Sequence, residues 1–108
     1  MKYPKEYLDE IKTRLKVSTV VSKSVNLKKR GKEFVGLSPF KTEKTPSFTV
    51  NDEKGFYHCF STAEHGNIFD FIMKTQNLKF GEAVKYLANL AGMQPYMFSK
   101  KDEEREKQ

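Results

Sequence analysis

The residues best suited to chemistry lie close together in one stretch, YHCFSTAEHG, at positions 57–66. It holds the only cysteine of the chain, Cys59, next to His58 and six residues before His65. Thiolates and imidazoles are zinc ligands, and a thiol activated by a nearby base can act as a nucleophile. However, neighbouring residues on a predicted strand, such as His58 and Cys59, point to opposite faces, and no base with an orienting partner can be assigned to Cys59. The stretch alone therefore predicts neither a catalytic thiol nor a complete metal site.

The distribution of charge indicates the kind of partner. The 108 residues suffice for one domain, and their formal net charge is +6. Residues 26–45 hold six Lys or Arg against two Glu, so the surplus positive charge is concentrated there. Such clustering favours a nucleic acid or another polyanion as partner. The charged start of the chain and the lack of an apolar run of about 20 residues lead us to expect a cytoplasmic protein that does not contact a membrane.

Helical periodicity appears at both ends of the chain. Pro4 suits a first helical turn, Asn67 is a favourable N-cap, and Gly92 is suited to the position just after a helix. The segment after the first helix is a weak helix candidate because it is rich in β-branched residues. The predicted helical segments are residues 4–16, 18–25, 67–76 and 79–92.

Two predicted hairpins lie between these helices. Residues 26–37 form the first, with a turn at Arg30–Gly31, and residues 47–60 form the second. Residues 38–46 contain two prolines, so they are predicted to be a loop. The order of elements predicts an α+β fold, with a small antiparallel sheet flanked by N- and C-terminal helices.

The predicted domain boundary follows from a change in composition. Residues 1–95 are expected to form the domain, because they contain all the patterned segments. Residues 96–108 are mostly charged and are expected to be a linker or a disordered tail.

Four segments, in this order, resemble the N-terminal domain of bacterial replicative DNA primases: VGLSPFKTEKTPSFTV, GFYHCF, HGNIFDFIM and FGEAVKYLA. The most specific stretch is PFKTEKTPSF, which follows KKRG and precedes FYHCF. The resemblance runs from about Tyr3 to Met93. It implies a zinc-ribbon-like sheet flanked by helices, in a protein that makes RNA primers for DNA replication.

The resemblance also implies four metal-ligand positions, of which this chain keeps one. They correspond to Ser38, Lys41, Cys59 and Thr62, where the family has Cys, His, Cys and Cys. Neutral hydroxyls and a lysine cation do not replace thiolates and imidazole around zinc. We therefore expect no zinc, and we expect Cys59 to be a small buried hydrophobe.

Hydrogen bonds and an ion pair are predicted to replace the metal. We expect Ser38 to bond to Thr62, and Lys41 to pair with Glu64 or Glu43. Because structural zinc contributes on the order of 10–16 kcal/mol to small domains, packing of the aromatic residues must also help to hold the loops.

A single-strand site needs cations for the phosphates and aromatic rings for the bases. We predict that Tyr57 and Phe60 stack on bases, with Phe56 and Phe40 as further candidates. The alternative is that the lysines are a solvated face and the aromatic residues a core. The predicted phosphate-binding residues are Lys28, Lys29, Arg30, Lys32, Lys41 and Lys44.

The family resemblance implies template single-stranded DNA binding and start-site recognition. It implies a separate polymerase domain, in cis or in trans, whose carboxylates bind Mg²⁺ for nucleotidyl transfer, and a replicative helicase that binds other regions. This chain has no such acidic cluster, so we expect it to be inactive alone. Two alternatives stay open: a protein-docking module that regulates the polymerase domain or contacts helicase, and a stand-alone single-strand-binding module.

Overall fold

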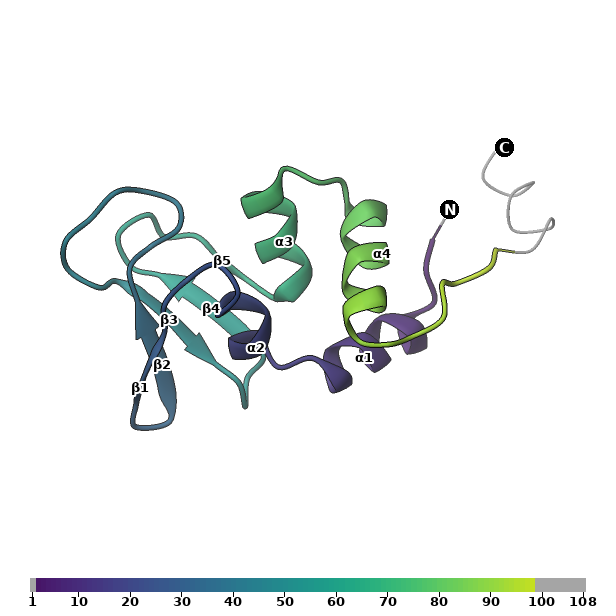
Figure 1. Ribbon diagram of the computed structural model, residues 1–108, viewed down its shortest axis with the longest axis horizontal. Helices are drawn as coiled ribbons and strands as arrows, with labels where there is room; N and C mark the ends of the chain where they lie inside the picture. Colours follow the sequence, from purple (N-terminus) through teal and green to yellow (C-terminus); the bar gives the residue numbers. More distant parts are fainter. Residues whose placement is uncertain (1, 99–108) are drawn as a thin grey trace.

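The computed structural model describes residues 2–98, with a sheet at one end of the molecule and helices toward the other (Figure 1). The α+β fold predicted from the sequence is confirmed. The elements in chain order are α1 (Lys5–Arg14), α2 (Val17–Val21), β1 (Lys28–Arg30), β2 (Glu33–Gly36), β3 (Phe48–Asn51), β4 (Phe56–Cys59), β5 (His65–Gly66), α3 (Ile68–Gln76) and α4 (Phe80–Leu90).

The five strands form an antiparallel sheet in the order β1-β2-β3-β4-β5. Both predicted hairpins are confirmed, and Gly31 adopts the positive φ of 64° that its turn requires. Strand β5 was not predicted, because two residues are too few to show alternation. Its pairing with β4 places His65 directly opposite His58.

The ends of α3 and α4 agree with the sequence, whereas α2 ends at Val21, four residues before the end of the predicted segment 18–25. The side chain of Asn67 accepts hydrogen bonds from the N–H groups of Phe69 and Asp70, and the Asp70 carboxylate accepts one from Asn67 N–H. This capping box fixes the start of α3. Gly92 follows α4 with a φ of 73°, as expected for a glycine that ends a helix. None of the helices described is long and apolar enough to span a membrane.

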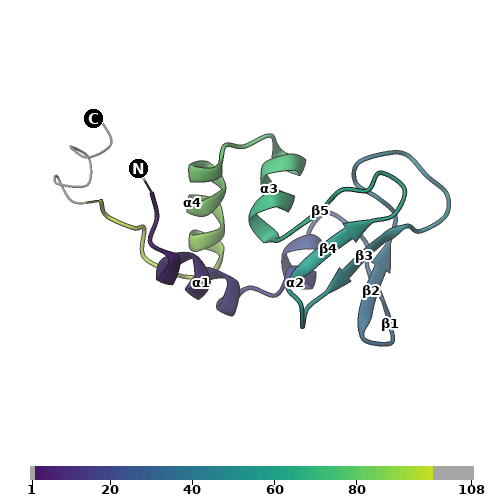
Figure 2. The same ribbon diagram turned by 180° about the vertical axis from the view of Figure 1, so that it is seen from behind.

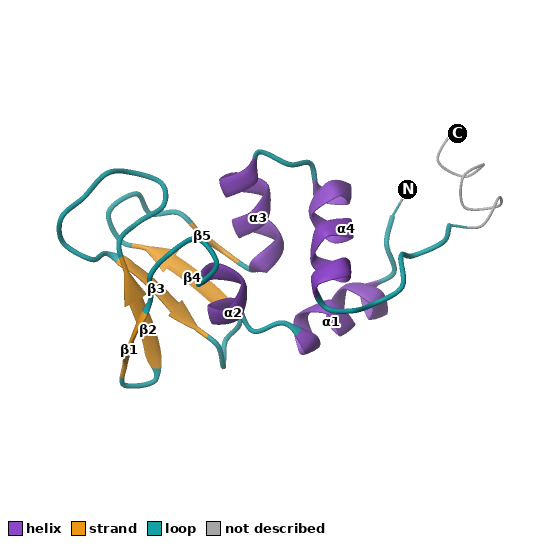
Figure 3. Cartoon of the chain, in the orientation of Figure 1, coloured by secondary structure: helices purple, strands orange, loops and turns teal. Residues whose placement is uncertain are grey.

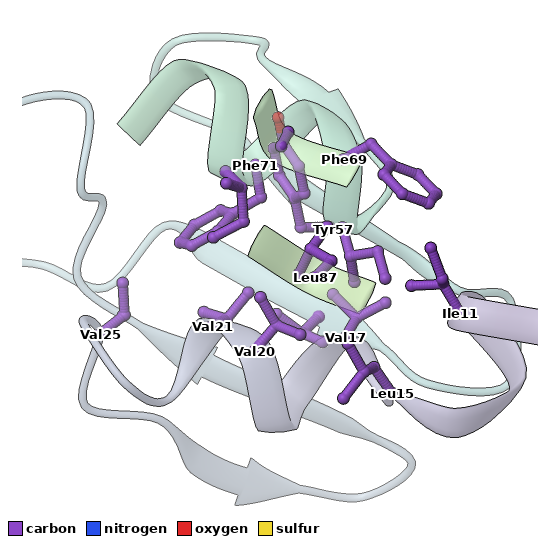
Figure 4. Close-up of a cluster of buried hydrophobic side chains, with 14 of the residues drawn as sticks. Ile11, Leu15, Val17, Val20, Val21, Val25, Tyr57, Phe69, Phe71 and Leu87 are labelled. Carbon is purple, nitrogen blue, oxygen red and sulfur yellow. The ribbon is translucent and has the colours of Figure 1, made fainter. Parts of the chain in front are cut away.

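Helices α2 and α3 lie between the sheet and the pair formed by α1 and α4 (Figures 2 and 3). Helix α2 contacts both β3 and α3, and α3 packs beside α4. The core fills the space between these layers (Figure 4). Because the helices cover one face of the sheet, the other face stays open.

An aromatic stack ties the sheet to α3. The rings of Phe48 and Tyr57 stack with centroids 5.4 Å apart, and Phe71 packs edge-on against Tyr57 at 5.6 Å. Phe48, Phe69 and Phe71 are buried and belong to the core. Such offset and edge-on pairs are the favoured geometries of aromatic cores.

The C-terminal segment begins as part of the folded unit. Tyr96 packs against Tyr7 with ring centroids 5.3 Å apart, and Phe98 packs against Tyr3 at 5.0 Å. The rest of the predicted charged tail, residues 99–108, lies outside the described part of the chain.

Candidate nucleic-acid interface and degenerate metal centre

Two of the four predicted ligand positions lie together at one end of the sheet. Ser38 follows β2, and Cys59 ends β4; the Ser38 Oγ and Cys59 Sγ atoms are 3.2 Å apart. Both side chains are buried. Thr62 bonds instead to Glu64, with its Oγ1 3.4 Å from a carboxylate oxygen, and Lys41 is exposed on the loop between β2 and β3.

These residues do not fit a zinc ion. The Sγ of Cys59 is the only thiol, and its polar neighbours are hydroxyls, including that of Ser61 at 3.3 Å. Within residues 2–98, no group of three or more His, Cys, Asp or Glu side chains is arranged to hold a metal. A structural zinc site requires four thiolate, imidazole or carboxylate ligands.

A carboxylate organises this site. Glu43 accepts hydrogen bonds from the N–H of Ser38 at 2.8 Å, the N–H of Ser47 at 3.1 Å and the hydroxyl of Ser47 at 2.7 Å. The Ser47 Oγ also lies 2.8 Å from the Ser61 Oγ, which continues the chain of hydroxyls to Cys59. We call these five residues the Glu43 cluster. It joins the β2–β3 loop to the segment that follows β4.

The interactions predicted to replace the metal do not form between the predicted partners. Ser38 bonds to Cys59 and Glu43 rather than to Thr62, and no ion pair of Lys41 with Glu43 or Glu64 occurs within the described residues. The reason is geometric: the carboxylate of Glu43 turns inward to the loop N–H groups, and Lys41 is exposed to solvent.

Hydrogen bonds set the ionisation of the cluster. The Ser47 hydroxyl, followed by the Ser38 N–H, holds the pKa of Glu43 below its usual value. Burial raises the pKa of the Cys59 thiol, but hydrogen bonds with Ser38, Ser61 and Thr62 outweigh it and lower that pKa to about 6. Cys59 is thus buried as expected, but it is a polar, hydrogen-bonded thiol rather than a simple hydrophobe.

The open face of the sheet carries a row of directly paired residues. Lys28 pairs with Val35, Val35 with Thr49, Thr49 with His58, and His58 with His65. Directly opposed residues of antiparallel strands point to the same face, so the row crosses all five strands. We call it the cross-strand row.

Two exposed aromatic rings flank the row at the two ends of β4. Phe56 is 54% exposed and Phe60 is 69% exposed. The ring of His58 lies between them and contacts Phe60 edge-on, with centroids 4.3 Å apart. His58 is thus a packed histidine. The arrangement also leaves one face of the sheet with large rings free for contact.

Tyr57 is wrong as a base-stacking residue. Only 1% of it is exposed, because it lies on the helix-facing side of β4 in the aromatic stack. Phe40 also packs inward, 6.0 Å from both Phe48 and Tyr57 by ring centroids. Phe60 is placed as the prediction requires.

The predicted cations are exposed on the β1–β2 hairpin and the β2–β3 loop, and by register Lys28 and Arg30 belong to the open face whereas Lys29 belongs to the other. All six are exposed, and none is in an ion pair with another residue of the described range. Four belong to the β1–β2 hairpin, and two belong to the β2–β3 loop. They are Lys28, Lys29, Arg30, Lys32, Lys41 and Lys44.

Comparison with known proteins gives consistent matches. The model of a family described as CHC2 zinc finger matches residues 3–104. The DNA primase of Haemophilus influenzae is 43% identical over 94 residues, which are 86% of this chain and 16% of that protein. The DNA primase of Pseudomonas putida is 46% identical over 91 residues, 84% of this chain and 14% of that protein. This chain therefore spans about a sixth of the length of these relatives.

A solved structure shares the fold. The crystal structure of the zinc binding and RNA polymerase domains of the Aquifex aeolicus primase matches with a TM-score of 0.78 and 28% identity. The match covers 89% of this chain and 24% of that one.

Proposed function

Since this chain belongs to the CHC2 zinc finger family of DNA primases, we propose that it is the template-binding domain of a primase and takes part in start-site recognition. The observation that carries the proposal is the open sheet face, which has exposed cations at its β1 edge and exposed rings at β4 and directly after it. Single-stranded nucleic acid is bound by this combination, because bases stack on rings while cations follow the phosphates.

The open face has cations at one end and aromatic rings at the other, and this difference defines a path for single-stranded DNA. The hairpin cations Lys28 and Arg30 lie at the β1 edge. Three strands away, Phe56 begins β4 and Phe60 directly follows it. A DNA strand that follows the cross-strand row from β1 meets the phosphate-binding side chains first and the base-stacking rings later. The row itself offers small or polar side chains, such as Thr49, that leave room for a backbone.

The remaining partners belong to the same proposal. A polymerase domain, in cis or in trans, supplies the carboxylates and Mg²⁺ for nucleotidyl transfer, and a helicase is expected to bind other regions of the full protein in the cytoplasm. This chain is expected to be inactive by itself. Docking on that polymerase domain is a second candidate function, favoured by a groove of about 290 Å³ between α1 and α4 that is lined by Tyr3, Tyr7 and Tyr96.

Metal independence is also part of the proposal. The Glu43 cluster supports it, because it joins by hydrogen bonds the loops whose corresponding positions in the family carry metal ligands. Elemental analysis of protein purified without added metal should find no zinc in stoichiometric amount, and a chelator should leave the melting temperature unchanged. One zinc per chain would contradict the proposal.

Titration of labelled single-stranded DNA tests the binding face. Replacing both Phe56 and Phe60 by alanine should weaken binding, because each stacked base contributes about 1–3 kcal/mol, or roughly 5- to 150-fold in affinity. Tyr86→Ala on α4 is the matched control, since Tyr86 is 37% exposed but remote from the sheet in sequence and fold.

The salt dependence tests the cations separately. Replacing Lys28 and Arg30 by alanine should reduce the slope of log affinity against log salt by about 1.4, because each phosphate that is no longer neutralised lowers the slope by about 0.7. Lys85→Ala on α4 is the control and should leave the slope unchanged. If the aromatic and the basic variants all bind like wild type, the open face is not the interface.

A further inference from the structure

A second feature lies at the end of the cross-strand row, beside β1. A cavity of about 480 Å³ opens there between the segment that leads into β1 and the loop that follows β2. Lys28 and Val35, the first two members of the row, are also part of its lining. The cavity is therefore continuous with the open face.

The lining of this cavity is mainly apolar and includes two lysines. Leu37, Pro39 and Pro46 line it from the β2–β3 loop, and Leu37 is 46% exposed. Lys28 of β1 and Lys44 of the β2–β3 loop both line the cavity, and both are exposed. An apolar slot between two cations suits a flat ring that carries a phosphate on either side.

Exposed polar groups in the lining can contact the edge of such a ring. Asn26 and Ser24 line the cavity from the segment before β1. That segment lies close to β2 because Gly36 has no side chain: a Cβ at Gly36 would lie 2.8 Å from the Asn26 carbonyl oxygen and 3.0 Å from a methyl carbon of Val25. The glycine therefore sets the width of the cavity.

We propose that this cavity binds one unpaired nucleotide of the template strand, with its base against Leu37 and the prolines and its flanking phosphates at Lys28 and Lys44. The proposal rests on the template-binding function proposed above. In it, most of the template strand lies on the open face, and one base leaves that face to enter the cavity. Asn26, an exposed residue that lines the cavity, is placed to discriminate between bases by the hydrogen bonds of its amide.

The test uses the 108-residue chain and a set of short single-stranded oligonucleotides, each with one abasic position. With wild type, one abasic position near the end of the bound segment should weaken binding by about fivefold or more, as expected when one stacked base is removed. With Leu37→Ser, that position should no longer matter, because the wall that the base contacts is gone. Leu37 is half-exposed, so this change should leave the melting temperature nearly unaltered.

Two further variants separate the cavity from the open face. Phe60→Ala should weaken the binding of all the oligonucleotides. The abasic position whose effect depends on Leu37 should stay the same as with wild type. Lys44→Ala should reduce the salt slope by about 0.7 without altering the abasic profile.

The outcomes distinguish the two proposals. If Phe60→Ala weakens binding and Leu37→Ser leaves both the affinity and the abasic profile as in wild type, the template-binding face stands and the cavity proposal is overturned. If the wild-type chain binds no oligonucleotide, both are overturned. Disappearance of the abasic effect in Leu37→Ser alone supports the nucleotide site.

Discussion

Tyr57 allows a sharp test of the structure, because its hydroxyl is buried without a protein partner. The oxygen has almost no accessible surface, and no hydrogen bond to it occurs within the described residues. Burial, and then the charge of Asp70, raises the pKa of Tyr57, so the group stays neutral in the accessible pH range. Replacing Tyr57 by phenylalanine therefore removes a desolvated hydroxyl and no charge.

The expected effect is an increase in stability. A buried polar group without a partner costs about 1–3 kcal/mol, and phenylalanine keeps the stacking on Phe48 and Phe71. The Nζ of Lys74 lies 5.9 Å from the ring centroid, and a phenyl face retains that contact. We expect Tyr57→Phe to raise the free energy of unfolding by about 1 kcal/mol, which is about 4–8 °C in melting temperature for a domain of this size.

Urea and thermal unfolding of two variants provide the assay. Tyr7→Phe is the matched control, because the Tyr7 hydroxyl donates a 2.8 Å hydrogen bond to the carbonyl of Gln94. Removing this bond should lower the free energy of unfolding by about 0.5–1.5 kcal/mol. The same chemical change should thus have opposite signs at the two tyrosines. A Tyr57→Phe variant less stable than wild type by more than about 0.5 kcal/mol would refute the reasoning, and weakened DNA binding in that variant would refute the exclusion of Tyr57 from the interface.

Three further predictions concern the Glu43 cluster. Glu43→Gln should be less stable than wild type at pH values above 4.5, the ordinary pKa of Glu. In urea unfolding, the difference in the free energy of unfolding should shrink as pH falls, because a group with a lowered pKa stabilises the fold only while its carboxylate is ionised. The ultraviolet absorbance of the Cys59 thiolate should appear near a pH of about 6 rather than 9, and Ser38→Ala should move that transition to higher pH. A triple variant with Ser38→Cys, Lys41→His and Thr62→Cys should bind one zinc by elemental analysis and lose thermal stability on chelation, whereas wild type should do neither.

Local patterns predicted the fold well because each helix and hairpin has its own signal. The capping residue Asn67, the turn at Gly31 and the prolines of the β2–β3 loop each fix a boundary through short-range geometry. Strand β5 was missed because it exists only through pairing with β4, which depends on the turn after Cys59.

The candidate site was less predictable because it depends on which face each side chain occupies. Alternation along β4 placed His58 and Cys59 on opposite faces, and the same parity places Tyr57 with Cys59 in the core and Phe56 with His58 outside. Applying that alternation to Tyr57 would have excluded it from the predicted base-stacking residues. By contrast, no local pattern shows that Glu43 turns inward to Ser38 and Ser47, because this depends on how the loop closes.

The Glu43 cluster and the proposed nucleotide site share the β2–β3 loop, and this sharing yields a prediction whose sign is informative. Ser38 lines the cavity and also bonds to Glu43 and Cys59, so the carboxylate positions the wall on which Leu37 lies. Electrostatics alone predicts that Glu43→Gln tightens DNA binding, because the change removes a negative charge from a basic surface. If the change instead leaves the loop out of position, DNA binding should weaken, and removing the base that contacts Leu37 should matter less.

Titration of the same oligonucleotides at two salt concentrations separates these effects, since the electrostatic gain is reduced at high salt and the positional effect persists. Binding by Glu43→Gln that is tighter at low salt and equal to wild type at high salt would mean that the cluster holds the fold but does not shape the interface.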